Sequence, residues 1–268
     1  MQRRGTGMRK RGIFVLFAVF FYTLFCFGVS APTINADGEN ILADFFTYYN
    51  QKDGGRSENI RLSARFIDGI ILQGYGEFSF NQTVGKRTKE NGFKEAKVIV
   101  SGEFVQGVGG GVCQVSTTLY NASLLAGLSV SEFHPHSLEV SYVPPSREAM
   151  VSLYSDLKIF NPYPFPVKFG VSVKNGVLRV RIFGKGEGYT FKLVSQVLET
   201  VAPPNPIEKE GEEDKILRRE RAGVKSVCYL EKYRKGTLVS KNKLRADEYR
   251  PIQGIIVKKI TRVSNKIA

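Results

Sequence analysis

The decisive stretch of the sequence is residues 109–122, which read GGGVCQVSTTLYNA. Its apolar residues Val115, Leu119 and Ala122 recur at helical spacing, and Gly127 stands where a helix would end. The three glycines that precede them let the backbone approach another group closely. The stretch therefore predicts a glycine-rich loop that leads into a buried helix over residues 113–125.

The segments on both sides of this helix predict mainly short strands. Before residue 74 we expect a helix over the apolar run 41–49, a turn at Asp53-Gly54-Gly55, and a second helix or a strand within 60–72. Asn175-Gly176 is typical of a hairpin turn. The fold class we expect is α+β, a mixed domain in which a glycine-rich loop, a buried helix and an antiparallel sheet are followed by a small β module. Alternating or β-branched residues predict strands at 78–80, 96–100, 138–143, 151–153, 156–160, 167–173 and 177–183.

The charge is uneven along the chain. The 268 residues carry a formal net charge of +14, and 42% of them are hydrophobic, which is typical of a folded protein. Residues 1–11 hold five basic and no acidic residues, and residues 223–268 hold twelve basic and three acidic residues. The remaining residues 12–222 are neutral overall, so all of the excess charge lies at the two ends.

The N-terminal segment is typical of a membrane anchor or a secretory signal. Residues 12–29 contain no charged residue and, as a helix, would span roughly 27 Å, close to the thickness of a bilayer core. Small residues that follow leave a cleaved signal peptide open as the alternative. Because basic residues precede the apolar run, we expect the N-terminus in the cytoplasm and everything after Asp37 outside.

This topology determines which partners we expect for the basic C-terminal segment. An exported basic segment meets peptidoglycan, anionic wall polymers and lipid headgroups, so we expect no nucleic-acid partner. The alternative is that these lysines form an ordinary solvated surface. The proline-rich, charged run 202–214 is typical of a linker. We expect four parts: a signal peptide or anchor at 1–36, an α+β domain at 37–201, a linker at 202–222 and a small basic β module at 223–268, with strands at 223–230, 236–239 and 254–260.

Cys113 is the candidate nucleophile. A thiol at the start of a helix is stabilised as a thiolate by the free amides and the helix dipole. The two histidines of the chain, His134 and His136, follow about twenty residues later, and Asp156 is placed to orient one of them. This order favours a thiol peptidase or acyl transferase, against the plainer interpretation that Cys113 is a packed core residue.

Other groups complete the candidate site. Arg147 follows the rigid Pro144-Pro145 loop and is a candidate for gripping a carboxylate. Two alternatives remain for the thiol and imidazoles: a metal site built on His134 and His136, and a disulfide between Cys113 and Cys228. We expect neither a metal nor another cofactor. The expected substrate-binding residues are Gly109, Gly110, Gly111, Gln114, Ser116, Thr117 and Arg147.

Several of these runs together resemble the VanW family. They are 76–81 (GEFSFN), 84–88 (VGKRT), 109–122, His136-Ser137 and 142–145 (YVPP), and the resemblance covers about residues 70–175. It implies a bacterial cell-envelope protein of a group named after an accessory gene of vancomycin-resistance clusters, and it implies no particular reaction. The C-terminal runs 221–256, with 233–236 (YRKG) and 249–251 (YRP), resemble a degenerate G-five module of the kind found beside peptidoglycan enzymes.

Three functions follow as expectations. The first is an exported envelope protein, held in the cell membrane or released to the wall, that engages peptidoglycan or its precursors. The second is a thiol peptidase or acyl transferase that acts on peptidoglycan stem peptides through Cys113, His136 or His134, and Asp156. The third is a non-catalytic assembly factor for other envelope proteins.

Overall fold

The computed structural model describes residues 40–100 and 102–259. Within these ranges the chain is α+β, with three helices and mostly antiparallel sheets, which confirms the expected class. None of the described helices is long and apolar enough to cross a membrane. The predicted anchor or signal segment lies outside the described residues and stays a prediction.

A four-stranded antiparallel sheet forms one layer of the core, in the order β1-β9-β8-β2. The predicted helix over 41–49 is wrong, because nearly all of this run lies in strand β1, which pairs with β9 with one irregularity between Ile41 and Ala43. Its aromatic and β-branched residues, such as Phe45 and Thr47, favour a strand. The predicted hairpin at Asn175-Gly176 is confirmed, with both residues at positive φ. The strands are β1 (Asn40–Tyr48), β2 (Ile71–Leu72), β8 (Val167–Lys174) and β9 (Val177–Gly184).

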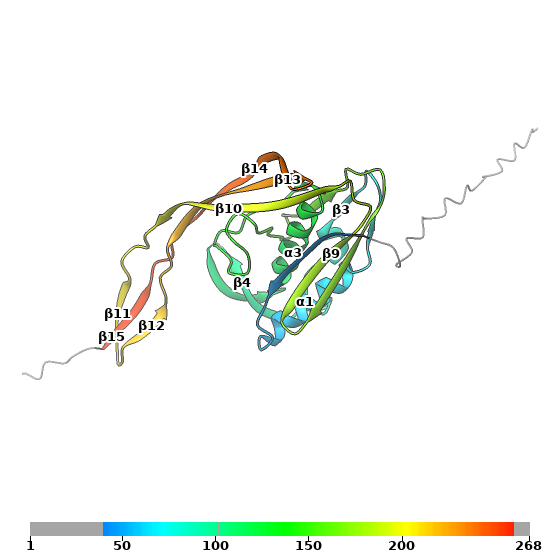
Figure 1. The fold of residues 1–268 in the computed structure, drawn as a ribbon. Helices are drawn as coiled ribbons and strands as arrows, with labels where there is room; N and C mark the ends of the chain where they lie inside the picture. The colour runs from blue at the N-terminus through cyan, green and yellow to red at the C-terminus, as the bar shows by residue number, and fades with distance from the viewer. Residues whose placement is uncertain (1–39, 101, 260–268) are drawn as a thin grey trace, which may run out of the picture. The chain divides into compact units, whose positions relative to one another are not determined.

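The decisive stretch forms α3 (Val112–Leu125), one residue longer than the predicted helix. Nearly every one of its side chains is buried, and it packs against β1, β9, β6, β10 and α1 (Gly54–Ile67). The helix ends as predicted, because Gly127 follows its C-cap with φ of +79°. Figure 1 shows α3 at the centre of the fold, with α1 beside it. The central helix therefore holds its first turn against several different elements.

Two smaller sheets flank this core. One has the order β3-β7-β6, and the other is the hairpin β4-β5 that leads into the glycine-rich loop. The predicted strand at 96–100 is confirmed as β4, and the predicted strand at 78–80 is instead β3 followed by the short helix α2. The elements are β3 (Glu77–Ser79), α2 (Phe80–Val84), β4 (Glu95–Val100), β5 (Glu103–Val108), β6 (Ser129–Glu132) and β7 (Lys158–Phe160).

The strands predicted at 138–143 and 151–153 are wrong, because residues 133–157 form an irregular loop. Side chains of α3 satisfy the backbone of this loop in place of a neighbouring strand. Ser116 Oγ donates to the carbonyl of Ala149 at 2.6 Å, and the amide of Ala149 donates to Thr117 Oγ1 at 3.0 Å. The alternating apolar residues of the loop therefore pack on the core without entering a sheet.

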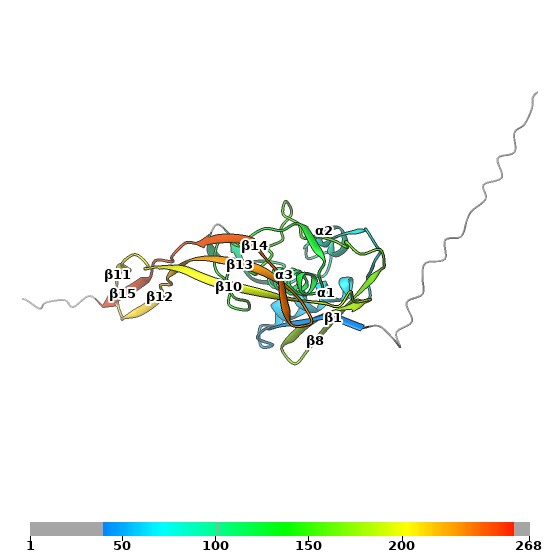
Figure 2. The ribbon, with the colours of Figure 1, turned by 45° about the horizontal axis from the view of Figure 1, so that its top comes forward.

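A three-stranded antiparallel sheet, β10-β13-β14, follows in the chain. In Figures 1 and 2 its strands run side by side past α3. Its partner strands lie on opposite sides of the predicted linker, since Tyr189 in β10 pairs with Arg234 in β13 and Val201 pairs with Gly223. The strands are β10 (Tyr189–Val201), β13 (Gly223–Arg234) and β14 (Thr237–Tyr249).

The predicted linker itself contains two strands. β11 (Ile207–Gly211) and β12 (Lys215–Arg218) pair on either side of β15 (Ile255–Lys259), with β11 parallel and β12 antiparallel to it. The composition of this segment predicts a linker, because β15, the strand with which β11 and β12 pair, lies about forty residues later and leaves no local signal. The division into domains stays a prediction, but both sheets are formed by pairing across the expected boundaries.

Candidate functional site

Cys113 occupies the second position of α3 and is held as a neutral thiol. Its Sγ donates a hydrogen bond to the carbonyl of Val151 at 3.4 Å. Burial raises the pKa of the thiol, while this hydrogen bond and the positive charges of Arg87 and Arg56 oppose the rise. The net direction is away from the thiolate that a nucleophile needs.

The two histidines lie in different surroundings. His134 Nε2 lies 3.0 Å from Glu132 Oε1, and Lys158 Nζ lies 2.9 Å from the other oxygen of this carboxylate. These partners, His134 first, hold the pKa of Glu132 at about 2. His136 is buried, and its Nδ1 has no hydrogen-bond partner among the described residues. Burial, reinforced by Arg245 and Arg56, lowers the pKa of His136 to about 4, so this imidazole is neutral at physiological pH.

The carboxylate of Asp156 accepts hydrogen bonds from neighbouring parts of the fold. One of its oxygens accepts from the amides of Asn81 and Leu157, each at 2.8 Å, and the other accepts from Ser79 Oγ. Among the described residues, no hydrogen bond joins this carboxylate to an imidazole or an imidazole to Cys113. The expected Cys113–His–Asp156 order is therefore present in the sequence but not assembled as a hydrogen-bonded triad.

The glycine-rich loop lies against two arginine stems. Gly109 and Gly111 have φ of +90° and +106°, and a Cβ at either position would lie 3.0 Å from a side-chain carbon of Arg87 or Arg56 respectively. A Cβ at Gly110 would lie 2.5 Å from the carbonyl oxygen of Lys97. Glycine is required here by backbone conformation and by close approach. The predicted loop thus positions two cationic side chains beside the start of α3.

Neither arginine is among the site residues that the sequence predicts. Arg56 Nη2 donates to Gln114 Oε1 at 2.7 Å, and Arg87 Nη1 donates to Asn81 Oδ1 at 2.8 Å. Arg87 lies within one of the runs that carry the family resemblance, which is the only signal for it. No local pattern points to Arg56, because its partner Gln114 is 58 residues away in the chain.

The polar residues of α3 are occupied inside the protein. Gln114 Nε2 donates to Thr47 Oγ1 at 3.0 Å and to the carbonyl of Tyr48 at 2.8 Å. Ser116 and Thr117 are fully buried and bind the backbone of Ala149. These contacts hold α3 against β1 and the 133–157 loop, and the expected role of the three residues in substrate binding stays a prediction.

Arg147 is likewise engaged within the fold. Its Nε donates to Asn121 Oδ1 at 2.9 Å, and its guanidinium lies 5.2 Å from the centre of the Phe45 ring. Burial lowers the pKa of Arg147 from its ordinary value. A carboxylate grip by this residue also stays a prediction.

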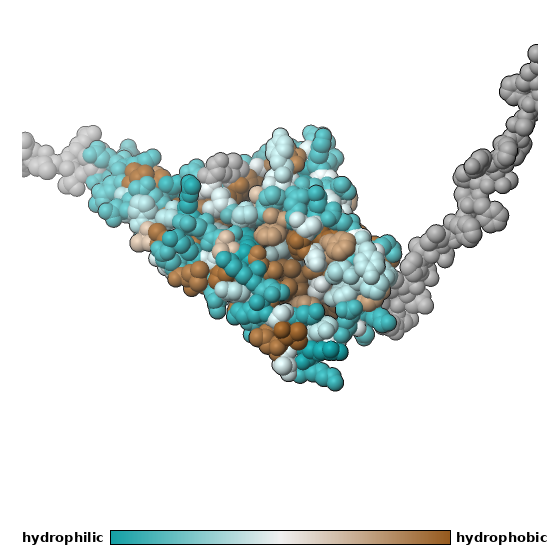
Figure 3. Space-filling model, turned by 90° about the horizontal axis from the view of Figure 1, so that it is seen from above, coloured by the Kyte–Doolittle hydropathy of each residue, from teal (hydrophilic) through white to brown (hydrophobic). Residues whose placement is uncertain are grey.

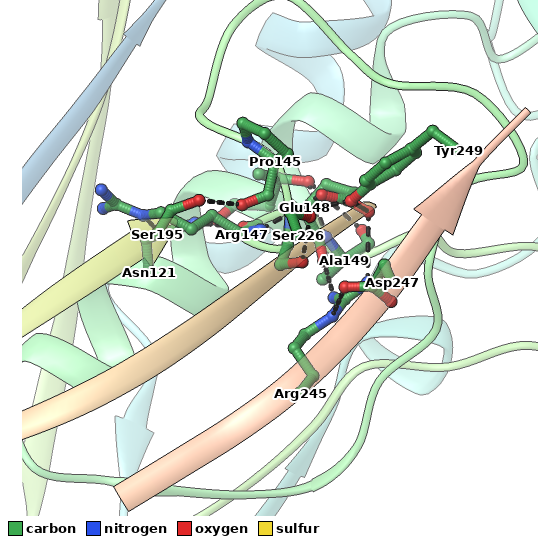
Figure 4. A network of polar contacts seen from close by, with 12 residues as sticks. Asn121, Pro145, Arg147, Glu148, Ala149, Ser195, Ser226, Arg245, Asp247 and Tyr249 are labelled. Atoms are coloured by element: carbon green, nitrogen blue, oxygen red, sulfur yellow. Dashed lines mark hydrogen bonds and ion pairs between the residues drawn. The ribbon is translucent and has the colours of Figure 1, made fainter. Parts of the chain in front are cut away.

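A buried polar network joins the same loop to the C-terminal sheet (Figure 4). Arg245 of β14 donates to the carbonyl of Glu148 at 2.6 Å and to its carboxylate at 3.1 Å. Tyr249 Oη donates to the same carboxylate at 2.6 Å, and Ser146 Oγ lies 2.7 Å from Ser226 Oγ of β13. The loop is therefore held between α3 on one side and β13 and β14 on the other.

The alternatives for the thiol find no support among residues 40–100 and 102–259. Cys113 and Cys228 are both free, so the alternative of a disulfide between them is wrong. In these ranges no three His, Cys, Asp or Glu side chains group in a way that would hold a metal ion. The site is an α+β scaffold in which a buried helix begins between two half-buried arginines.

This class of domain has known relatives, and the sequence comparisons identify them. Residues 55–183 match the family described as VanW like protein. The chain is 42% identical over 143 residues to the uncharacterized protein YoaR of Bacillus subtilis (strain 168), which is 53% of this chain and 47% of that protein. Residues 55–183, which contain Arg56, Arg87, Cys113 and Asp156, therefore form a VanW-like domain.

Two further similarities are more distant. The vancomycin B-type resistance protein VanW of Enterococcus faecalis (strain ATCC 700802 / V583) is 27% identical over 90 residues, which is 34% of this chain and 33% of that protein. The chain thus aligns with half or less of the length of either curated relative. The crystal structure of HP0197-G5 matches 26% of this chain and 96% of its own, at 19% identity and a TM-score of 0.16, a value too low to define a shared fold.

Proposed function

We propose that this VanW-like protein is an exported envelope protein that binds peptidoglycan or its precursors without catalysing a reaction on them. In this proposal the N-terminal segment anchors it in the cell membrane or directs its export, and the main domain lies outside. The observation that carries the proposal is a set of exposed basic side chains on the hairpin formed by β13 and β14, most of which have no acidic partner among the described residues.

These basic side chains lie on or directly beside one sheet, and most lack an acidic partner in the part of the chain that the structure describes. The exposed cations are Arg234, Lys235, Lys241 and Lys243 of the hairpin and Arg250, which directly follows β14. Of these five, only Lys241 has an acidic partner among the described residues, Glu231 at 3.2 Å. An unpaired cation remains available for an anionic polymer, whereas a paired one is largely neutralised.

Aromatic rings lie beside these cations. Lys232 Nζ lies 3.7 Å and the Arg234 guanidinium 5.5 Å from the centre of the Tyr189 ring, and Lys241 Nζ lies 4.8 Å from the Tyr229 ring. Figure 3 shows hydrophobic and hydrophilic residues interspersed on the face seen from above. Aromatic rings next to cations suit a polymer that presents both sugar faces and carboxylates. This arrangement supports a wall polymer as the partner.

The surroundings of Cys113 support a role without catalysis. The thiol donates to a carbonyl, its pKa is raised by burial, and no imidazole hydrogen-bonds to it within the described residues. A thiol enzyme needs the opposite arrangement, with an activating base in reach. The resemblance to an envelope family and the uncharged run at 12–29 support export.

Sedimentation with purified sacculi tests the proposal. Wild-type protein in detergent micelles should sediment with sacculi at low salt and less so as the salt concentration rises, because the attraction is screened. The triple variant Arg234→Gln, Lys235→Gln and Lys243→Gln should lose most of this binding. A matched triple variant, Lys52→Gln, Lys97→Gln and Lys174→Gln, removes the same charge from exposed positions elsewhere and should bind as the wild type does.

Sacculus binding that does not change with salt concentration, or an equal loss of binding in both triple variants, would overturn the proposal. Substitutions are preferable to a deletion of residues 223–268, because the deletion would also remove the partners of β10 and of buried Glu148.

A further inference from the structure

Two half-buried arginines lie beside the start of α3, and neither has a carboxylate partner within the described ranges. Arg56 comes from the first turn of α1, and Arg87 comes from the segment that follows α2. Their stems lie against opposite ends of the loop Gly109–Gly111, and both charges act on Cys113. No carboxylate oxygen lies within ion-pair distance of either guanidinium among residues 40–100 and 102–259.

The orientation of both side chains is fixed by neutral groups. Gln114, which binds Arg56, is itself held by Thr47 and by the carbonyl of Tyr48. Arg87 Nη1 donates to Asn81 Oδ1 at 2.8 Å and to the carbonyl of Gly85 at 3.0 Å. A guanidinium has five N–H donors, so each arginine keeps several donors that no described protein group uses. Fixed donors of this kind bind an anion with little loss of side-chain entropy.

The described residues do not balance the positive charge beside the start of α3. Burial lowers the pKa of Arg87, which means that its charge is held at a free-energy cost that an anion would relieve. Asp156 acts on Arg87 from beyond ion-pair distance, and both of its oxygens are already used by Ser79, Asn81 and Leu157. The local balance of two cations and one engaged carboxylate therefore favours a bound anion.

An orphaned polar atom gives a second, independent indication of a missing partner. His136 is 8% exposed, and its buried Nδ1 has no hydrogen-bond partner among the described residues. The charges of Arg245 and Arg56 both act on this imidazole, and the charge of Arg56 also acts on the phenol of Tyr142. Buried polar atoms are nearly always paired, so the unpaired Nδ1 indicates a partner that the described residues do not supply.

We propose that Arg56 and Arg87 together bind an oxyanion, the carboxylate of a peptidoglycan peptide or a phosphate of a precursor, at the start of α3. The choice of these two sources rests on the proposed function, whereas the oxyanion chemistry rests on the two arginines and does not depend on that function. Both anions match the fork of a guanidinium, which binds two oxygens at once. The site lies within the family domain and is separate from the basic side chains of β13 and β14.

Titration calorimetry on the full chain in micelles tests the inference with three probes. They are acetyl-Lys-D-Ala-D-Ala as the free acid, the same peptide with a C-terminal amide, and inorganic pyrophosphate. The free acid should bind at least about ten-fold more tightly than the amide, because a charged hydrogen-bond pair is lost in the amide. Arg56→Gln and Arg87→Gln should each weaken binding by about ten-fold or more, and Arg61→Gln, an exposed arginine on α1, should leave it unchanged.

Tighter binding of pyrophosphate than of the peptide acid, with the same losses in both arginine variants, supports the site with phosphate as the source. A readout on the wild type covers variants that fail to fold: the arginine Nε–H signals of Arg56 and Arg87 should shift on addition of the bound probe. Equal binding of acid and amide without pyrophosphate binding, no binding of any probe, or unchanged arginine signals would overturn the inference.

Sacculus binding distinguishes the two proposals. If the sacculi are bound through the β13–β14 cations but no probe binds, the oxyanion site fails and the proposed function stands. If pyrophosphate binds through Arg56 and Arg87 but sacculi are not bound at any salt concentration, the proposed function fails and the oxyanion site stands.

Discussion

Arg245 and Glu148 form an ion pair of 3.1 Å whose side chains are only 4% and 1% exposed. The pair joins strand β14 to the loop that carries Ala149 and Val151, the residues bound by α3. Asp247 adds a second carboxylate to Arg245 at 2.6 Å. The C-terminal sheet is therefore tied to the candidate site through a dehydrated charge network, although the family match ends at residue 183.

Removal of one partner from this network should be costly. Arg245→Leu leaves Glu148 buried without its cation, and we expect a loss of about 3–5 kcal/mol in the free energy of unfolding. Urea denaturation followed by circular dichroism measures it. The control is Lys225→Ala, which breaks the exposed 2.8 Å pair with Glu199 in the same sheet and should cost less than about 1 kcal/mol. Losses of similar, small size in both variants would contradict a structural role for the buried pair.

The glycine-rich loop should tolerate no side chain at its centre. Gly110→Ala would bring a Cβ to 2.5 Å from the Lys97 carbonyl oxygen and 2.8 Å from Ala96 Cβ, so we expect a cost of about 1–3 kcal/mol from overpacking. Gly54→Ala is the matched control. It lies in the first turn of α1 with nothing within 4 Å of the new Cβ, and we expect it to be neutral or stabilising by up to about 1 kcal/mol. Thermal unfolding of the two variants side by side tests this difference, and a Gly110→Ala protein as stable as the wild type would contradict it.

Local patterns predict the elements whose partners are near in the chain. The helix from Cys113 and the hairpin at Asn175-Gly176 are confirmed because spacing and turn residues specify them locally. The predicted helix over 41–49 is wrong because apolar spacing alone does not distinguish a short strand from a helix. The strand that pairs with this run, β9, lies about 135 residues later in the chain. Strands β11 and β12 are not predicted for the same reason, because their partner strand, β15, is distant in the sequence.

In the candidate site too, residues that are close in the sequence are predicted together, whereas residues that meet only through tertiary packing are not. The glycines and Cys113 stand together in one run of sequence and are found together in the structure. Arg56 and Arg87 reach them from two other elements, and only the packing of α1 on α3 and the segment after α2 makes that proximity visible. Asp156 has the expected position in the order of residues, but its hydrogen bonds to Ser79, Asn81 and Leu157 depend on tertiary contacts that no spacing reveals.

Cys113 should react slowly in the folded protein. Burial raises the pKa of Cys113, and it raises that of Cys228 to about 11, so both thiols are protonated at pH 7.5. In a Cys26→Ser background, iodoacetamide should label both at least about ten-fold more slowly than in urea, with rates that rise with pH. Mass spectrometry of the labelled peptides measures the rates. Rapid, selective labelling of Cys113 at neutral pH would contradict this and would favour a thiol enzyme.

His136 should titrate far below an ordinary histidine. Its pKa is lowered from 6.5 to about 4, first by burial and then by the charges of Arg245 and Arg56. Because the chain has only two histidines, their C2–H signals can be followed separately by proton NMR. The unfolded chain takes up a proton near pH 6.5, whereas the folded protein does so only near pH 4. The stability contributed by the neutral imidazole is therefore complete above pH 6.5 and is lost as the pH falls toward 4.

The largest loss that this shift of the His136 pKa explains is about 3 kcal/mol, since one unit of pKa corresponds to about 1.4 kcal/mol. Urea denaturation at pH 7 and pH 4.5 should reveal it as an acid sensitivity that is smaller in His136→Gln. His134→Gln serves as the control, because His134 is half-buried beside Glu132 and its removal leaves the buried imidazole in place. An acid sensitivity that is unchanged in His136→Gln, or a His136 signal that titrates near pH 6.5, would mean that the imidazole is solvated and is not the orphaned group beside Arg56.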